Sequence, residues 1–284
     1  MPLISMPLTP QLIEAYEQAL YVLDAGPVLR IGARSSELDR LLDEHGARAA
    51  AFVTAANPRG EERPSEANAA AMAALRASLG RPWLAGDGRD PAGRWSAEPS
   101  VLVLGISRPE AEALGRRLEQ NAIVFVEKGG APELVLLRKM RLVLDTQVWL
   151  DWLVFDEPSV AGLRAAVESG RAEVVIDADC LAELERVLAY PLGRRVDIAA
   201  CLATCQKVGI PVKHEDARAV VGLPQCRDPD DQKFVTLAAG ARADCLVTRD
   251  RELARLKRRC APWFAVLGPA AFVPRPEAPT SPAA

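Results

Sequence analysis

Acidic residues in the second half of the chain have the types and positions of a metal site; they are Asp145, Glu183, Asp231 and Asp250. Asp145 directly follows a short apolar run, Asp250 closely follows another, and Glu183 comes soon after a third. Such runs predict buried parallel strands, and ligands of open parallel sheets bind beyond the carboxyl ends of the strands. We therefore expect the acids to share one cleft. Because clustered carboxylates repel one another unless a cation lies between them, the pattern predicts an Mg²⁺ or Mn²⁺ site that activates water against a phosphodiester.

An alternation of strands and helices would position these acids. Strands are expected at 142–144, 174–176, 245–247 and 264–267. Helices are expected near 148–153, 160–168, 180–188, 196–207, 216–220, 230–239 and 251–257. Alternation of this kind predicts a parallel sheet between two layers of helices, which is a three-layer α/β/α domain.

The preceding part of the chain has a different pattern and predicts an α+β domain with a mixed or antiparallel sheet. Helices are expected at 10–23, 35–42, 65–79 and 110–119, and strands at 28–31, 49–53, 101–104, 123–126 and 134–137. The segment 83–95 is rich in glycine and aspartate and is expected to be a hairpin or loop. We therefore predict an α+β domain over 1–139, an α/β domain over 140–273, and a disordered tail rich in Pro, Ala and Ser over 274–284.

Composition limits the classes of function. With 49% hydrophobic and 26% charged residues, the chain has the balance of a soluble globular protein, and no apolar stretch reaches the roughly 18 residues of a membrane span. The first residues lack the pattern of a signal peptide, so a cytoplasmic location without membrane contact is expected. A net charge of −3 excludes an overall basic nucleic-acid binder, and two histidines exclude a three-histidine metal site within one subunit.

A basic stretch follows Asp250. If it is helical, Arg251, Arg255 and Arg258 share one face and offer an RNA backbone a positive surface beside the acids. The alternative is a solvated surface helix whose cations are favoured by the helix dipole in its last turn.

Residues 141–273 resemble the PIN-domain ribonucleases, in particular the toxin components of toxin–antitoxin systems. The resemblance rests on the motifs Leu144-Asp145-Thr146, Ala182-Glu183-Leu184, Asp228-Pro229-Asp230-Asp231-Gln232-Lys233-Phe234 and Leu246-Val247-Thr248-Arg249-Asp250. It implies that Asp145, Glu183, Asp231 and Asp250 ligate Mg²⁺ or Mn²⁺, that Asp228 assists, and that Thr146 and Thr248 support the site. Asp231 is preferred over Asp230 because Phe234 then falls where the family has a buried apolar residue. Gln147 departs from the Asn that usually follows the Asp-Thr pair.

The first domain resembles a small bacterial family of unknown function through the T-A-x-N-P segment Thr54–Pro58 and the segment Gln120–Val124. Its polar residues could converge in a hydrogen-bonding pocket; they are Thr54, Asn57, Asn68, Gln120 and Asn121. Turn and helix-cap roles explain the same residues, and we favour that interpretation.

Two functions of different classes follow. The first is a metal-dependent endoribonuclease, with RNA, an antitoxin protein and a second copy of the chain as the expected partners and the first domain in a regulatory role. The alternative is a non-catalytic protein- or RNA-interaction module with a vestigial acidic site. The intact acids favour the nuclease, whereas Gln147 favours the alternative weakly. A nucleotide-binding enzyme is disfavoured because no glycine-rich phosphate loop follows a strand.

Overall fold

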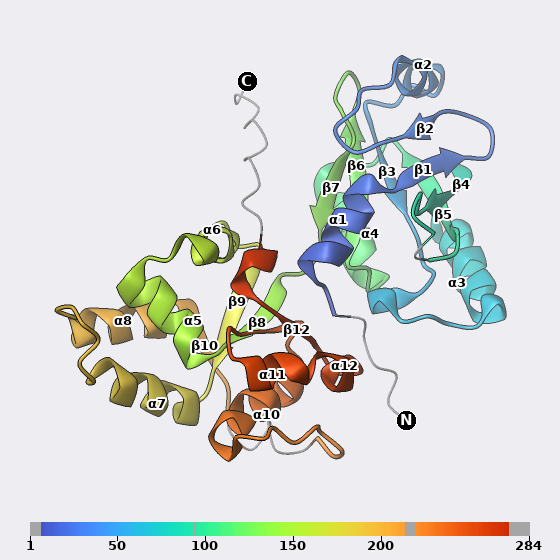
Figure 1. Ribbon diagram of the computed structural model, residues 1–284. Helices are drawn as coiled ribbons and strands as arrows, with labels where there is room; N and C mark the ends of the chain where they lie inside the picture. The colour runs from blue at the N-terminus through green and yellow to red at the C-terminus, as the bar shows by residue number, and fades with distance from the viewer. Residues whose placement is uncertain (1–6, 94, 214–219, 273–284) are drawn as a thin grey trace. The chain divides into compact units, whose positions relative to one another are not determined.

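A computed structural model describes residues 7–93, 95–213 and 220–272. The chain divides into two compact units (Figure 1): the first unit contains Gln11–Arg138, and the second unit contains Pro7–Pro10 together with the residues from Lys139 onward. The helix expected near 216–220 and the tail expected at 274–284 fall outside the described ranges.

The first unit is built on a seven-stranded sheet with the order β2-β1-β4-β5-β3-β6-β7. Its strands are β1 (Leu20–Leu23), β2 (Val28–Leu29), β3 (Ala49–Val53), β4 (Trp83–Arg89), β5 (Glu98–Leu104), β6 (Ala122–Glu127) and β7 (Glu133–Leu136). Its helices are α1 (Pro10–Gln18), α2 (Ser36–Glu44), α3 (Ser65–Ser78) and α4 (Arg108–Arg117), with the 3₁₀ turn η1 (Pro58–Gly60). Every pair of neighbouring strands is antiparallel, so the sheet is antiparallel rather than mixed.

Two elements of the first unit differ from expectation. Leu20–Leu23 was expected at the end of a helix but is the strand β1, because its alternate side chains are buried when it pairs with β4. The segment 83–95, expected to be a hairpin or loop, contains the seven-residue strand β4, which pairs antiparallel with β5. A Cβ on Gly86 would lie 2.3 Å from the carbonyl oxygen of Val22. This glycine therefore allows close approach of β1 and does not mark a turn.

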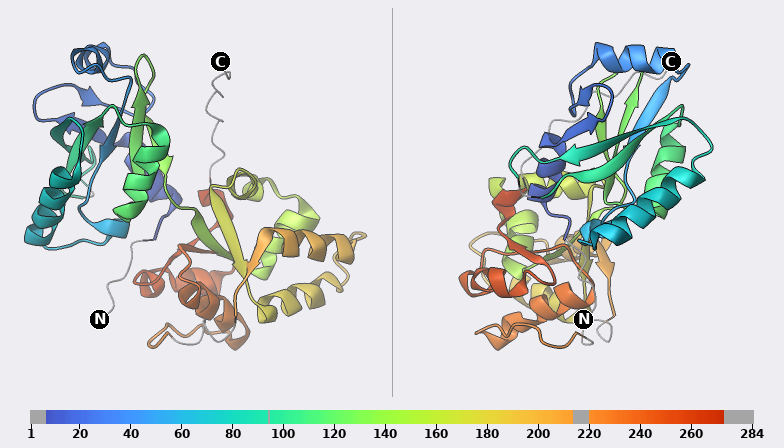
Figure 2. Two further views of the ribbon diagram at one scale, coloured as in Figure 1. Left: turned by 180° about the vertical axis from the view of Figure 1, so that it is seen from behind. Right: turned by 90° about the vertical axis from the view of Figure 1, so that its right-hand side faces the viewer.

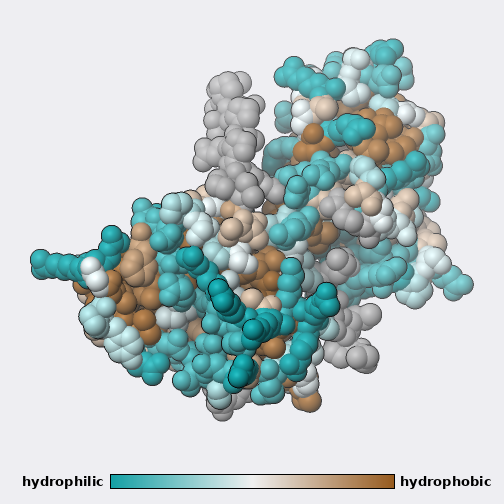
Figure 3. All heavy atoms as spheres, in the orientation of Figure 1, coloured by the Kyte–Doolittle hydropathy of each residue, from teal (hydrophilic) through white to brown (hydrophobic). Residues whose placement is uncertain are grey.

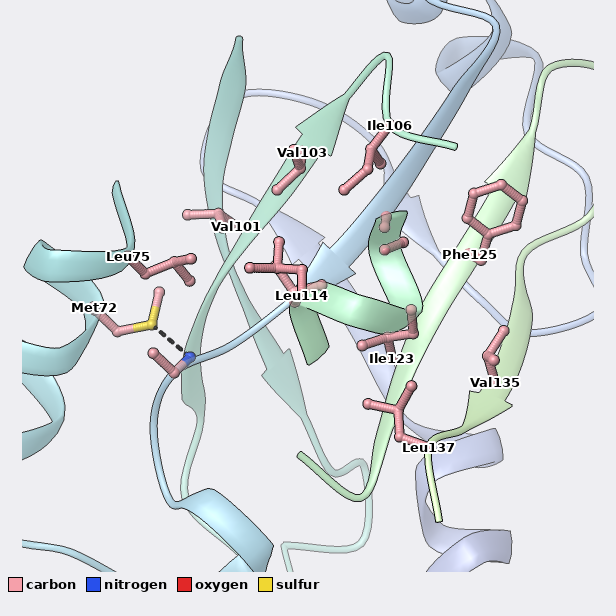
Figure 4. Packing of buried hydrophobic residues seen from close by; sticks show 14 residues of the cluster. Met72, Leu75, Val101, Val103, Ile106, Leu114, Ile123, Phe125, Val135 and Leu137 are labelled. Carbon is pink, nitrogen blue, oxygen red and sulfur yellow. Dashed lines mark hydrogen bonds between the residues drawn. The ribbon is translucent and has the colours of Figure 1, made fainter. Parts of the chain in front are cut away.

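The core of the first unit lies on both faces of its sheet. On β3, Ala51 and Val53 join one cluster, whereas Ala50 and Phe52 join the other, as the alternation of strand side chains requires. Figure 4 shows the first cluster, where α3 and α4 cover the sheet. There the sulfur of Met72 accepts a hydrogen bond from the backbone N–H of Ala55 at 3.1 Å, which fixes the loop that follows β3.

The second unit has a five-stranded parallel sheet with the order β10-β9-β8-β11-β12. Its strands are β8 (Met140–Leu144), β9 (Ala172–Ile176), β10 (Gly209–Pro211), β11 (Cys245–Val247) and β12 (Ala265–Leu267). The helices are α5 (Thr146–Leu150), α6 (Ala161–Glu168), α7 (Ala178–Leu188), α8 (Ile198–Val208), α10 (Gln232–Gly240), α11 (Arg251–Arg255) and α12 (Lys257–Cys260). They flank the sheet in the α/β/α arrangement expected from the sequence (Figure 2).

Shorter helical turns complete the second unit. A π-helical turn, η2 (Asp151–Phe155), extends α5, and 3₁₀ turns lie at η3 (Pro158–Val160), η4 (Pro229–Asp231) and η5 (Pro269–Ala271). None of the helices in the described ranges is long and apolar enough to cross a membrane.

The segment Pro7–Pro10 packs with the second unit although the first unit follows it in the chain. Leu8 is fully buried, and its backbone N–H donates to Oδ1 of Asp244 at 2.6 Å. Oδ2 of Asp244 accepts from the N–H of Arg141 at 2.8 Å. Asp244 thus joins this segment to the beginning of β8.

Candidate metal centre

Asp145 lies at the carboxyl end of β8 and is 3% exposed. Its Oδ1 accepts from the N–H of Val148 at 2.8 Å, so the side chain caps α5. Its Oδ2 accepts from the Thr248 hydroxyl and, at 3.2 Å, from the N–H of Arg249. Burial raises the pKa of this carboxyl above its ordinary value, while these hydrogen bonds oppose the increase.

Asp250 lies just beyond β11, the strand that neighbours β8. The two acids are linked by Thr248, whose hydroxyl oxygen accepts from the N–H of Asp250 at 2.9 Å and whose proton is directed to Asp145. Oδ1 of Asp250 caps α11 by accepting from the N–H groups of Glu252 and Leu253. The parallel register thus brings Asp145 and Asp250 to the same edge of the sheet, as the sequence predicted.

Glu183 reaches the same edge from α7. Its Oε1 accepts from the Thr146 hydroxyl at 2.7 Å, and its Oε2 forms an ion pair with Lys233 on α10. Both members of the ion pair are largely buried, at 15% exposure for the Glu183 side chain and 19% for Lys233. Lys233 therefore acts as an internal cation among the predicted metal ligands.

Asp231 lies at the end of η4, immediately before α10. Partial burial raises the pKa of its carboxyl to about 6, and repulsion by Asp250, Asp228 and Glu183 adds to the increase, whereas Lys233 opposes it. Asp228 is exposed and caps η4 by accepting from the N–H of Asp230 at 2.9 Å. Asp231 therefore experiences the charges of Glu183 and Asp250, which indicates that these acids form one electrostatic cluster.

The donor chemistry of this cluster fits a hard divalent cation, because carboxylate oxygens are the preferred ligands of Mg²⁺ and Mn²⁺. The side chains of the cluster do not have the positions of a metal coordination shell. In the described ranges, no three Asp, Glu, His or Cys side chains are grouped closely enough to hold a metal ion. The contacts above explain this, since Glu183 is engaged by Thr146 and Lys233, and Asp145 and Asp250 each cap a helix.

Comparison with known protein families agrees with this geometry. Residues 141–252 match the family model of the PIN domain. The second unit contains a PIN domain. Residues 53–123 match the model of a protein family of unknown function, DUF3293. A search of curated proteins returned no match to the chain. These two family matches confirm the resemblance to the PIN domain and to a family of unknown function, while the resemblance to toxin components stays a prediction. PIN domains are in general hydrolytic nucleases and usually use divalent metals.

Sequence reasoning missed two charged groups at the PIN domain's edge. Lys233 was considered only as part of a motif, and its position as the second residue of α10 gives no signal that it pairs with Glu183. Asp151 is 1% exposed and forms an ion pair with Arg249 at 2.8 Å. The amide of Gln147 donates to Asp151 at 3.1 Å. The spacing of four residues between Gln147 and Asp151 could have revealed this contact.

The basic stretch is arranged differently from the single helix that we expected. Helix α11 ends at Arg255, and α12 begins after Leu256, so Arg258 is not on a continuous face with Arg251 and Arg255. All three arginines are exposed, and Arg255 forms an ion pair with Glu252. Figure 3 shows hydrophilic side chains gathered over α11 and α12. The stretch remains a positive surface that begins one residue after Asp250.

The five polar candidates of the first unit divide into two groups. Thr54, Gln120 and Asn121 line a common cavity. Asn57 and Asn68 instead hydrogen-bond to each other at 2.8 Å beside it. The structure thus combines the two interpretations of these residues, since some have turn roles and others face a cavity.

Proposed function

We propose that the PIN domain is a divalent-metal-dependent endoribonuclease and that its biological role is that of a toxin component. The proposal rests on four acids that come from four separate segments of the chain and interact at one sheet edge. Thr248 links Asp145 to Asp250, while Asp231 experiences the charges of Asp250 and Glu183. If the acids at this sheet edge served only as helix caps, Glu183 and Asp231 would not be needed there.

Asp145, Glu183, Asp231 and Asp250 would hold Mg²⁺ or Mn²⁺, with Asp228 as an accessory acid. When bound, such an ion polarises a phosphodiester and lowers the pKa of water. The protein's own contribution is orientation. Thr248 and the N–H of Arg249 fix the Asp145 carboxylate, and Thr146 fixes Glu183. Preorganised carboxylates reduce the reorganisation that cation binding requires.

Lys233 partly neutralises the cluster in the absence of a bound cation. Because its ammonium contacts Glu183, Glu183 becomes available as a full ligand only when this ion pair opens. The positive side chains that follow Asp250 would contact the RNA backbone through Arg251, Arg255 and Arg258. We further propose that the partners are RNA, an antitoxin protein and a second copy of the chain. The proposed location is cytoplasmic, and the first unit has a regulatory role.

The test compares Asp231→Asn with Asp230→Asn in the full-length protein. Asp231→Asn removes one charge from the cluster, and we expect RNA cleavage with Mn²⁺ to fall by roughly 100-fold or more. Asp230→Asn is the matched control, because Asp230 is exposed and contributes only backbone atoms to the hydrogen bonds found for it. It should retain activity near that of the wild type.

A melting curve accompanies the cleavage assay. Asp231→Asn should melt at or above the wild-type temperature without metal, because it removes repulsion from Asp250 and Asp228. Unchanged cleavage in Asp231→Asn would refute the proposal and favour the non-catalytic interaction module. Equal losses in the two variants would mean that Asp231 has no special role among the acids.

A further inference from the structure

The first unit contains a cavity of about 70 Å³ on the sheet face opposite α3 and α4. Alternation along β5 places Glu98 and Ser100 on the face where Leu102 and Leu104 join the core, and both line the cavity. Its floor and walls come from α1, β1, β3, β4, β5 and β6. The cavity lies wholly within the first unit, so it is independent of the acidic cluster in the PIN domain.

Among the described residues that line this cavity, Glu98 is the only acidic one. Its Oε1 accepts from the Asn57 amide at 2.9 Å. Asn57 is itself held by the Asn68 amide and by the N–H of Arg63, both of which donate to its Oδ1. Burial raises the pKa of Glu98 to about 7, and the Asn57 hydrogen bond is the one influence that opposes the increase. Among the described residues, no cation forms an ion pair with this carboxyl group.

Three of the hydrogen-bond donors around the cavity are already used by protein acceptors. Thr54 donates to the carbonyl of Pro99 at 2.7 Å. The Gln120 amide donates to the carbonyl of Ala56 at 2.9 Å, and the Tyr21 hydroxyl donates to the carbonyl of Tyr16 at 2.8 Å. The second oxygen of Glu98 is an acceptor that the cavity offers to a ligand, and a ligand with a donor group can pair with it.

Aromatic rings form the wall beside this acceptor. Tyr16, Tyr21 and Phe52 all line the cavity, and the rings of Tyr21 and Phe52 meet edge to face at 5.4 Å between centroids. Aromatic faces attract ammonium and guanidinium groups. A half-buried carboxylate with no counter-ion among the described residues, together with aromatic rings, is the combination that favours a small organic cation over a neutral or anionic molecule.

One cation lies near this wall and must be considered. The Arg138 guanidinium donates to Oδ1 of Asn121 at 2.8 Å. Burial raises the pKa of Tyr16, and the charge of Arg138 opposes that increase. It does not contribute to the pKa of Glu98. Asn121 therefore holds Arg138 on the side of Tyr16, and no cation among the described residues pairs with the Glu98 carboxylate.

We propose that this cavity binds an organic cation through its ammonium or guanidinium group, with the Glu98 carboxylate as counter-ion. Either a free small molecule or the arginine or lysine side chain of another protein could supply that group. The proposal gives the first unit a ligand-recognition role that does not depend on the nuclease activity of the PIN domain.

Binding should depend on pH because only the ionised form of Glu98 attracts a cation. Tyr16 and Tyr21, the other titratable groups that line the cavity, have raised pKa values and stay neutral in this range. With a Glu98 pKa of about 7, the ionised fraction falls roughly tenfold between about pH 8 and about pH 6, and the affinity should fall with it.

The test is calorimetric titration of the full-length protein at about pH 8 with methylguanidinium and, in parallel, with the peptide acetyl-Gly-Arg-Gly-amide. Methylurea, which has nearly the same shape without the charge, is the ligand control. Glu98→Gln keeps the side-chain shape and the Asn57 contact and removes the charge. Glu127→Gln, at the exposed end of β6, is the matched protein control.

Supporting results are binding of either cation, at least roughly tenfold weaker binding in Glu98→Gln, unchanged binding in Glu127→Gln, and no binding of methylurea. Tighter binding of the peptide would identify a protein side chain as the occupant, whereas binding of methylguanidinium alone would identify a free small molecule. Absence of binding by both cations, or equal affinity for wild type and Glu98→Gln, would overturn the proposal. Melting curves of both variants verify that they are folded.

Discussion

Each unit of this protein holds a carboxylate beside a strand, with Asp145 buried just after β8 and Glu98 half-buried at the first residue of β5, but the two carboxylates have different surroundings. Asp145 in the PIN domain accepts from the Thr248 hydroxyl and from the N–H groups of Val148 and Arg249. Glu98 in the first unit accepts from a single amide, that of Asn57. Burial raises the pKa of both, yet several hydrogen bonds oppose the increase at Asp145 and only one does so at Glu98.

The difference follows from the two kinds of sheet. At the carboxyl edge of a parallel sheet, the chain enters a helix after the strand, and the first N–H groups of that helix have no partner within it. Asp145 uses such a group in α5. Within an antiparallel sheet the N–H groups are used by neighbouring strands, so Glu98 on β5 has to rely on side chains. A parallel edge therefore stabilises a carboxylate, whereas an antiparallel strand leaves it in need of a counter-ion.

The largest stability effect should come from truncating the well-bonded acid. Asp145→Ala removes a helix cap and leaves the Thr248 hydroxyl and the Arg249 N–H without their acceptor, and we expect a loss of roughly 3 kcal/mol in the free energy of unfolding. Asp197→Ala is the control, because Asp197 is exposed and caps α8 by accepting from Ala200. Its expected loss is about 1 kcal/mol. Chemical denaturation measures both, and equal losses would remove the distinction between the two environments.

Glu98→Gln should have the opposite effect, of roughly 2 kcal/mol, at about pH 8. The folded-state pKa of about 7 exceeds the ordinary value of 4.5, so the folded protein retains the proton more strongly than the unfolded chain. The wild type therefore loses stability as the pH rises from about 4.5 through about 7, and it changes little above that range. Glu98→Gln lacks this loss. Stabilities of the two proteins that remain parallel from about pH 5 to about pH 8 would contradict the origin of the shift.

The smallest effect concerns the charged surface beside the acids. Replacing Arg251, Arg255 and Arg258 by alanine should weaken RNA binding with little sequence dependence and make its salt dependence less steep, since each lost phosphate contact reduces counterion release. The slope of RNA affinity against salt concentration should change by less than the loss of three phosphate contacts would cause, because Arg255 is paired with Glu252. Stability should hardly change.

The control for this variant replaces three exposed arginines of the first unit, namely Arg34, Arg48 and Arg63, and makes the same change in net charge. Filter-binding titrations over a series of salt concentrations compare the two triple variants. An unchanged salt slope in the first variant, or an equal change in both, would leave the stretch after Asp250 as a solvated surface.

Sequence patterns predicted those parts of the fold that depend on local periodicity. The apolar runs before Asp145 and Asp250 are neighbouring parallel strands, and Ser35 caps α2 as expected. The segment of β4 was left as a hairpin or a loop because Gly86 has the appearance of a turn residue, whereas its role is set by the carbonyl of Val22 on another strand. Local patterns do not contain such a contact.

The candidate site shows the same limit. The types of the four acids and their places after strands predicted which residues would meet. The sequence did not reveal that Lys233 lies between them, because its partner Glu183 is far away in the chain. Glu98 could have been noticed, since the alternation of Glu98, Ser100 and Leu102 places a carboxyl group on a core face. Its lack of a counter-ion depends on tertiary structure.

The burial of Leu8 has a consequence for how the protein can be dissected. The chain contributes Leu8 to the second unit, then forms the whole first unit, and returns at Lys139, so the first unit is an insertion near the beginning of the PIN-containing unit. A fragment that starts at Lys139 would lack a fully buried leucine and one of the donors to Asp244. During synthesis, the leading segment must wait for β8 and Asp244 to emerge before it can dock. Linking Pro7–Pro10 to Lys139 through a short flexible linker is therefore the appropriate way to isolate the PIN domain.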